Sequence, residues 1–377
     1  MRTLLLLLAS TALVAGLALP FRSVKGNADG AHKYSVQLYY KIPNQMYSLW
    51  VTNITVGTPG QTFLSFIDTT SSGFWVADAS CDNSFSPGCY GVKMFYSNAS
   101  STYVPTINGT YMSNNTFGDS FGIVGVDNVK LGNDDAKAVL IPNTPFGQSD
   151  SLPYYLRNTG INSVLGIGFP GLTPSAPSPL FNDAIAKGVV KKGIITIWFE
   201  DQYETDDNGV GGTIYYGDED PLHCTGTVNY TPLSRASLWQ YTTPNVAVNG
   251  VRVSSIGNIQ TIIDTTSNFI TAPPQVVNAI LSALKIKNST GRNPVVPCNT
   301  KINLTFLMNN TAQTITELNL VTKDANGVCN LAIMKAMPKG TDNGIRFELG
   351  EPFIRGRCLF FDYNNEQIGF TDAGTHT

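Results

Sequence analysis

The sequence predicts a mainly β protein in which two related β lobes face each other across a central cleft. Short apolar or alternating runs, such as TFLSFID at 62–68 and CLFFDY at 358–363, recur between Gly, Pro, Asn and Asp residues, which favour turns. The pentapeptide Ile-Asp-Thr-Thr-Ser occurs twice, at 67–71 and 263–267, each time behind an apolar run. This repeat indicates two lobes of common design, and a chain of 377 residues can form a core in each.

The N-terminus has the pattern of a secretory signal peptide. Arg2 precedes a continuous apolar stretch, and small residues lie near Gly16 and Ala18. A membrane anchor is the alternative, but the stretch is shorter than the ~20 residues that a span needs. We therefore expect a signal peptide over residues 1–18, and a protein that is secreted or lysosomal.

Asparagine triplets and cysteines both indicate a protein that passes through an oxidising compartment where glycosylation occurs. The chain has eight Asn-x-Ser/Thr triplets, which are candidate glycosylation sites: Asn53, Asn98, Asn108, Asn114, Asn229, Asn288, Asn303 and Asn309. It also has six cysteines, an even number that suits disulfides. Fifteen pairings of six cysteines are possible, so spacing alone leaves the pairing open. No C-x-x-C spacing indicates a zinc site.

Two helices are expected among the strands. At 178–188, Ser178 suits the N-cap, Pro179 the first helical position and Gly188 the exit. The second helix is expected from Pro273 to Lys285.

The boundary between the lobes is expected in a Gly-rich stretch, DDNGVGGTIYYG, at 206–217. This gives an N-terminal β lobe over 47–214 and a C-terminal β lobe over 215–377.

Composition limits the partners. Charged residues make up only 14% of the chain and its formal net charge is −3. Such a chain has no basic surface for nucleic acid or for an anionic membrane. We expect no cofactor, no metal, no nucleic-acid partner and no stable membrane insertion.

Histidine is scarce, which argues against several kinds of catalysis. His32 follows the apolar N-terminus and His376 is the penultimate residue, so only His223 lies within the body of the chain. We interpret His223 as a surface or turn residue. The chain therefore has too few histidines to favour histidine-dependent nucleophilic catalysis or a metal site built from histidines. The sequence has no phosphate-binding G-x-x-x-x-G-K-[ST] motif and no G-x-S-x-G motif.

The repeated aspartates are the best candidates for chemistry. Asp68 and Asp264 each follow an apolar run, and a buried carboxylate is costly unless it is paired or hydrogen-bonded. If the lobes are related by pseudo-symmetry, the two carboxyls meet and share a proton at acidic pH. One can then act as a base toward water while the other protonates a carbonyl.

The residues after each aspartate have expected supporting roles. We expect the hydroxyls of Ser71 and Ser267 to hold the outer carboxylate oxygens. Thr69 and Thr265 are expected to link the two loops.

These motifs resemble the pepsin-like aspartic endopeptidase family, from about Leu49 to Thr371. NITVGTPGQTFLSFIDTTSSGFWV, at 53–76, is similar to the opening strand, the turn and the first catalytic loop of the family, with Trp75 at its tryptophan. SVLGIGFP, at 163–170, resembles the segment that packs under this loop, and places Leu165 and Gly166 there.

The C-terminal half carries the rest of the resemblance. GGTIYYGDEDP, at 211–221, is similar to the crossover between the lobes, and FELGEPFIRGRCLFFDYNNEQIGFTDA, at 347–373, to the second supporting segment and closing strands. Glu348 there occupies a normally apolar position. The resemblance implies a bilobal pepsin-like acid protease fold, a peptide or protein substrate, and a monomer. It also implies the disulfides Cys81–Cys89, Cys298–Cys329 and Cys224–Cys358.

Three features depart from the family pattern. Thr70 and Thr266 stand where the family has glycine in Asp-Thr-Gly, and a β-branched residue there can crowd the dyad. In the hairpin that covers the substrate, Phe117, followed by Gly118, is the counterpart of the family's tyrosine only if the hairpin is shortened; without a gap Asn115 takes that place. The pro-segment, over 19–46, is short and mildly basic.

Two functions follow. The first is an acid endopeptidase that activates water through Asp68 and Asp264. The alternative is a catalytically impaired or inactive glycoprotein of the same fold that binds peptides or a partner. A carbohydrate hydrolase could use the same carboxylates, but no other residue supports it.

Overall fold

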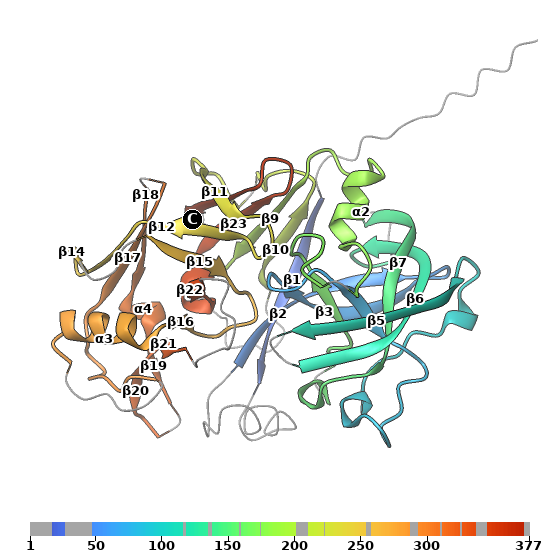
Figure 1. The fold of residues 1–377 in the computed structure, drawn as a ribbon, viewed down its shortest axis with the longest axis horizontal. Helices are drawn as coiled ribbons and strands as arrows, with labels where there is room; N and C mark the ends of the chain where they lie inside the picture. Colours follow the sequence, from blue (N-terminus) through green and yellow to red (C-terminus); the bar gives the residue numbers. More distant parts are fainter. Residues whose placement is uncertain are drawn as a thin grey trace, which may run out of the picture.

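The computed structural model describes residues 17–26, 47–115, 118–134, 138–157, 160–173, 175–200, 210–221, 223–253, 258–286, 293–309, 311–324, 326–336 and 345–372. These residues form mostly strands, in two lobes that lie side by side (Figure 1). The predicted mainly β, bilobal fold is confirmed.

The N-terminal lobe, on the right of Figure 1, contains seven strands and one helix. The strands are β2 (Tyr47–Val56), β3 (Gln61–Asp68), β4 (Phe74–Ala77), β5 (Val104–Asn115), β6 (Gly118–Leu131), β7 (Val139–Ser151) and β8 (Ser163–Gly166), and the helix is α2 (Leu180–Ala186). Three short 3-10 helices lie at Pro87–Cys89, Ser97–Ala99 and Tyr154–Leu156.

The C-terminal lobe is built from shorter strands. They are β12 (Gln240–Thr243), β13 (Asn245–Val248), β14 (Val251–Arg252), β15 (Ile259–Ile263), β16 (Ile270–Ala272), β17 (Asn303–Met308), β18 (Thr311–Thr316), β19 (Val321–Lys323), β20 (Cys329–Leu331), β21 (Ile333–Lys335) and β22 (Ile345–Leu349). Its helices are α3 (Pro274–Ala283), α4 (Glu317–Leu320) and α5 (Glu351–Ile354).

An antiparallel sheet joins the lobes. Its strands pair in the order β2, β1, β10, β9, β23, β24 and β11. Their remaining bounds are β1 (Leu17–Gly26), β9 (Ile194–Phe199), β10 (Val210–Tyr216), β11 (Asn229–Arg235), β23 (Arg357–Asp362) and β24 (Gln367–Asp372). Because β10 belongs to this sheet, the expected lobe boundary at residue 214 falls within a shared strand.

The N-terminal assignments stay predictions. Strand β1 contains residues 17–18 of the expected signal peptide and residues 19–26 of the expected pro-segment. The rest of residues 1–46 lies outside the described residues, as do His32 and His376.

Strand register shows how the two halves correspond. In the N-terminal lobe, β8 runs parallel to β3, with Gly166 opposite Asp68, and antiparallel to β4. In the C-terminal lobe, β22 runs parallel to β15, with Leu349 opposite Ile263, and antiparallel to β16. The two repeats of the pentapeptide therefore leave equivalent strands.

Both expected helices are present, with small differences at their ends. Helix α2 begins at Leu180 with Pro179 as its N-cap, and no side chain caps it, so the expected Ser178 cap is wrong. Gly188 follows its C-terminus with a φ of +65°, a left-handed conformation that suits glycine. Helix α3 covers Pro274–Ala283, within the expected range.

An aromatic cluster packs beneath the first aspartate. The indole N–H of Trp239 and the hydroxyl of Tyr363 both donate to the carbonyl of Ile167, at 2.8 and 2.6 Å. The N–H of Ile167 donates to the carbonyl of Asp68 at 2.8 Å. Trp239 and Tyr363 come from the second half of the chain, so this buried network fixes the segment around Asp68 against the rest of the molecule.

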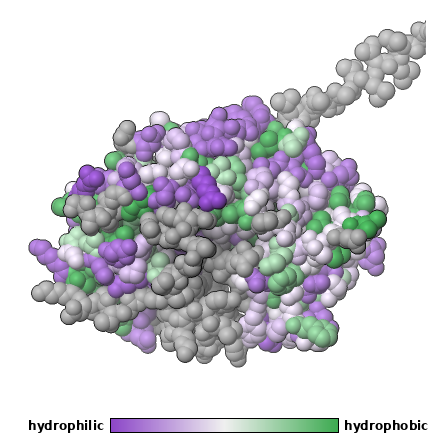
Figure 2. Space-filling view, viewed as in Figure 1, coloured by the Kyte–Doolittle hydropathy of each residue, from purple (hydrophilic) through white to green (hydrophobic). Residues whose placement is uncertain are grey.

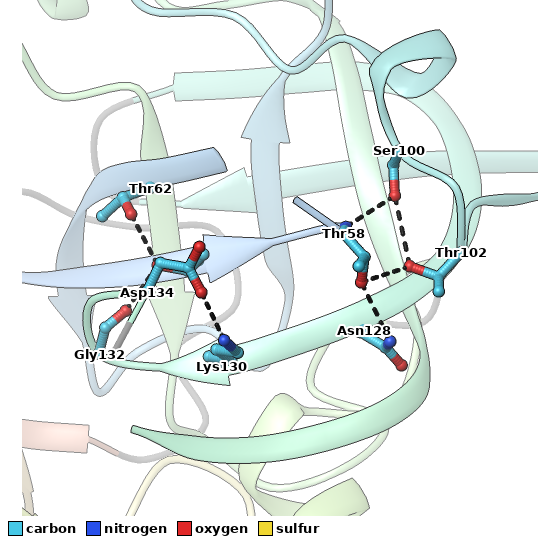
Figure 3. Close-up of polar contacts among 9 residues, drawn as sticks. Thr58, Thr62, Ser100, Thr102, Asn128, Lys130, Gly132 and Asp134 are labelled. Atoms are coloured by element: carbon cyan, nitrogen blue, oxygen red, sulfur yellow. Dashed lines mark hydrogen bonds and ion pairs between the residues drawn. The ribbon is translucent and has the colours of Figure 1, made fainter. Parts of the chain in front are cut away.

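Side-chain hydrogen bonds hold the turn between β2 and β3, which precedes Asp68 (Figure 3). The N–H of Thr58 donates to Ser100 Oγ at 3.0 Å, and the amide of Asn128 donates to Thr58 Oγ1 at 3.4 Å. At the other end of the turn, Lys130 and Asp134 form an ion pair. The contacts of Thr58 tie the turn to the segments around Ser100 and Asn128.

The surface is suited to water, and some sequons are accessible. Figure 2 shows hydrophilic and hydrophobic residues intermixed on the viewed face. Asn98, Asn303 and Asn309 are exposed, whereas Asn53 and Asn229 are half-buried. The side chains of Asn108 and Asn114, and all of Asn288, lie outside the described residues. Among the described helices, none has the length and hydrophobicity to cross a bilayer.

Three disulfides are present, Cys81–Cys89, Cys224–Cys358 and Cys298–Cys329, and they are the pairs that the family resemblance implies. Cys224–Cys358 joins residues separated by 134 positions and packs in a small core with Trp198 and Phe360.

Removing the Cys224–Cys358 disulfide is expected to destabilise the protein more than removing Cys81–Cys89. A cross-link that closes a longer loop restricts the unfolded chain more, with a difference of about 2 kcal/mol between these two loops. Chemical denaturation of the two double Cys→Ala variants measures this. An equal or larger loss from the Cys81–Cys89 variant would contradict it.

Candidate active site

The two repeated aspartates lie at the ends of equivalent strands. Asp68 is the last residue of β3, and Asp264 follows the last residue of β15. Asp68 is fully buried and Asp264 is only 4% exposed. The apolar residues of each strand thus carry a carboxyl into the interior, at matching positions of the two lobes.

The threonines after the aspartates connect the two loops. The Thr69 hydroxyl donates to the carbonyl of Ile263 at 2.8 Å, and the Thr265 hydroxyl donates to the carbonyl of Ile67 at 2.7 Å. Each backbone N–H donates in turn to the other threonine's Oγ1, at 3.2 and 3.1 Å. These reciprocal bonds are the expected link between the loops, and they hold the aspartates at a fixed separation.

The next threonines hydrogen-bond to the aspartates. The Thr70 N–H and hydroxyl both donate to Asp68 Oδ1, at 2.7 and 2.6 Å. The Thr266 N–H and hydroxyl both donate to Asp264 Oδ1, at 2.9 and 2.6 Å. The same oxygen of each carboxyl therefore accepts two hydrogen bonds from one residue.

The two serines differ in their contacts: Ser267 does not hold its aspartate, whereas Ser71 lies beside Asp68. The Ser267 hydroxyl donates to the carbonyl of Phe269 at 3.0 Å and accepts from its N–H at 3.2 Å, so it is used within its own loop. Ser71 lies close enough to Asp68 to lower the pKa of that carboxyl. Its buried Oγ nevertheless makes no hydrogen bond of ordinary geometry among the described residues. The threonine hydroxyls, which were not expected to contact the aspartates, are the side-chain donors to Oδ1 in both lobes.

Two glycines allow close packing under the loops. A Cβ at Gly166 would lie 2.6 Å from the carbonyl oxygen of Gly73, and one at Gly350 would lie 2.3 Å from that of Ser267. Gly166 was expected there from the sequence. Gly350 is its equivalent in the second lobe.

Burial and neighbouring charges set the electrostatics. Burial raises the pKa of Asp264 to about 7, with further contributions from the charges of Glu348 and Asp68. Burial also raises the pKa of Asp68, against hydrogen bonds from Thr70 that lower it. Because the two carboxyls repel each other when both are ionised, the pair retains one proton at acidic pH.

Glu348 lies where its charge raises the pKa of Asp264. It pairs with Ile262 and Thr271, between β15 and β16. Phe347 and Leu349 point into the core, so alternation places Glu348 on the opposite face, the face of Ile262 and Asp264. The equivalent residue in the first lobe is Val164, which is fully buried. The resemblance predicted an unusual acid at this position, but only the register shows that it puts a third acid near Asp264.

The hairpin expected to cover the substrate is formed by β5 and β6. Phe117 lies outside the described residues, and Gly118 begins β6 opposite Asn115. Trp75 is fully buried in one apolar cluster with Tyr111, whose hydroxyl lies 2.6 Å from Ser120 Oγ. Tyr111 was not predicted from the sequence, because the local pattern in β5 gives no clear signal: Met112 is exposed and Ser113 is buried.

His223 is more than a surface turn residue. Its ring stacks on Trp198 with centroids 4.3 Å apart, and Nδ1 lies 2.6 Å from Oδ2 of the buried Asp220. Within the described part of the chain, no group of three or more His, Cys, Asp or Glu side chains could hold a metal ion.

The fold and the paired carboxyls define the class as a bilobal aspartic protease architecture. The sequence profile of the eukaryotic aspartyl protease family matches residues 49–373, and the chain belongs to this family. It is 28% identical to pepsin A of Rhinolophus ferrumequinum over 87% of this chain and 82% of that protein. It is 29% identical to aspartic protease 6 of Caenorhabditis elegans over 86% and 81%, and 27% identical to cathepsin E-B of Xenopus laevis over 86% and 80%.

Proposed function

We propose that the protein is an aspartic-type endopeptidase that hydrolyses peptide bonds at acidic pH through water activated by Asp68 and Asp264. The observation that carries this proposal is the pair of buried carboxyls on equivalent loops, joined by the hydrogen bonds of Thr69 and Thr265. Membership of the aspartyl protease family supports it.

The two carboxyls have different roles in the proposed reaction. Asp264, with its pKa of about 7, holds the shared proton, and Asp68 acts as the base. Asp68 takes a proton from water while the water oxygen attacks the peptide carbonyl carbon, and Asp264 gives its proton to the carbonyl oxygen. The resulting diol then collapses: the C–N bond breaks, the leaving nitrogen takes the proton from Asp68, and Asp264 regains a proton from a diol hydroxyl.

The second candidate function is a glycoprotein of the same fold that binds peptides or a partner with impaired or no catalysis. It is favoured by Thr70 and Thr266, whose hydroxyls already occupy one oxygen of each carboxyl. Under either function we propose a secreted or lysosomal location, which the signal-like N-terminus and the disulfides support.

Cleavage of denatured globin at about pH 3.5, with and without pepstatin, tests the proposal. We expect pepstatin-sensitive cleavage by the full chain or after removal of residues 1–46. Binding of pepstatin without cleavage would favour the second function. Absence of both, in a folded protein, would refute an active dyad.

A further inference from the structure

We propose that the hydroxyls of Thr70 and Thr266 are positioning groups of the dyad, each holding Oδ1 of its aspartate in a fixed orientation. This inference rests on the proposed endopeptidase function. The hydroxyl bonds are 2.6 Å long in both lobes, and the backbone N–H of the same threonine binds the same oxygen.

The same pair of hydrogen bonds to the aspartate occurs in both loops. The two loops are far apart in sequence, yet each threonine binds the aspartate two residues before it through both of its donors. Two donors converging on one oxygen restrain rotation of the carboxyl group. The two hydroxyl bonds, at 2.6 Å, are also shorter than the backbone N–H bonds to the same oxygens.

The hydroxyls of the neighbouring serines make no hydrogen bond to Oδ1 of either aspartate among the described residues. Ser267 is committed to the backbone of Phe269, and Ser71 Oγ makes no ordinary hydrogen bond among the described residues. Asp68 Oδ2 is buried and has no protein hydrogen-bond partner in the described part of the chain. The Thr70 hydroxyl is therefore the side chain that holds Asp68 Oδ1.

The hydroxyls also oppose the effect of burial. A hydrogen bond donated to an ionised carboxyl favours the charged form, and those from Thr70 and Thr266 lower the pKa of Asp68 and Asp264. The acids acting on Asp264 are Asp68 and Glu348, while Glu351, at the start of α5, contacts Asn268 and Arg355. None of these groups changes in the variants below.

Valine and serine substitutions separate the hydroxyl from the methyl group. Thr→Val replaces only the hydroxyl, and Thr→Ser removes only the methyl. The full-length protein is labelled with ¹³Cγ-aspartate, and Asp68 and Asp264 are assigned by loss of their signals in Asp→Asn variants. Titration then follows each carboxyl without relying on activity. The exposed Thr314 on β18 provides the matched control, Thr314→Val.

We expect Thr266→Val to raise the titration midpoint of Asp264 by about one pH unit or more, and Thr70→Val to do so for Asp68. Globin cleavage by Thr70→Val/Thr266→Val should fall about 10- to 100-fold, with the pH profile moved upward. The Thr→Ser variants and Thr314→Val should retain the wild-type midpoints. Should a valine variant misfold, Thr→Ala removes the same hydroxyl.

Wild-type midpoints in the hydroxyl-free variants would overturn the inference. An equal shift in Thr→Ser and Thr→Val would do so too, because the methyl packing would then be responsible. Faster cleavage by Thr70→Gly/Thr266→Gly would show that the threonines crowd the dyad instead. If the wild-type protein cleaves nothing, the proposed function fails while the titration still decides whether the hydroxyls act on the carboxyls.

Discussion

Replacing Asp264 by Asn is expected to reduce pepstatin-sensitive cleavage by about 10³-fold or more, because an amide cannot hold or deliver the shared proton. Asn keeps the shape of the side chain and an oxygen that can accept from Thr266. Asp68→Asn should have an effect of similar size, since the base is lost. Initial rates of globin cleavage at acidic pH measure both.

The matched control is Asp82→Asn. Asp82 is exposed on the loop closed by Cys81–Cys89, and it tests whether loss of an ordinary carboxylate alters the assay. Near-ultraviolet circular dichroism checks that each variant is folded. If Asp264→Asn kept a tenth or more of the wild-type rate, the reaction would not depend on this dyad.

The second large effect is on stability. The pKa of Asp264 is raised from 3.8 to about 7 in the folded protein. Between these values the folded protein binds a proton that the unfolded chain releases, so the free energy of unfolding falls as pH rises. At about 1.4 kcal/mol per pH unit, and less near the two midpoints, the loss between pH 4 and pH 7 is about 3 kcal/mol. Asp68, also raised, changes stability in the same direction.

Chemical denaturation at a series of pH values measures this loss. Asp264→Asn should remove most of the decline, because its side chain does not titrate. Glu348→Gln should move the decline to lower pH, since removing this charge lowers the pKa of Asp264. In Asp82→Asn the decline should persist. An unchanged decline in Asp264→Asn would show that other groups cause it.

Much of the architecture could be predicted from the chain. The strands and the two helices follow from patterns of neighbouring residues, and such patterns can be recognised in the sequence without the tertiary structure. The repeated pentapeptide can be recognised in the same way. The ends of the helices were less predictable: α2 starts at Leu180 without the expected Ser178 cap, because Pro179 already provides the turn into the helix. The sequence also did not predict Tyr111 as a neighbour of Trp75, because this contact forms only in the tertiary structure.

The sequence by itself determined that an acidic pentapeptide occurs twice behind apolar runs, and its resemblance to the family predicted departures at Thr70, Thr266 and Glu348. The tertiary structure decided what those departures do. The hydrogen-bond partner of a hydroxyl depends on the loop conformation. In this conformation the hydroxyls of Thr70 and Thr266 donate to the aspartate carboxyls, whereas that of Ser267 donates to a carbonyl of its own loop. The pKa of Asp264 likewise depends on burial and on Glu348, far along the chain, because electrostatic interaction follows distance in space.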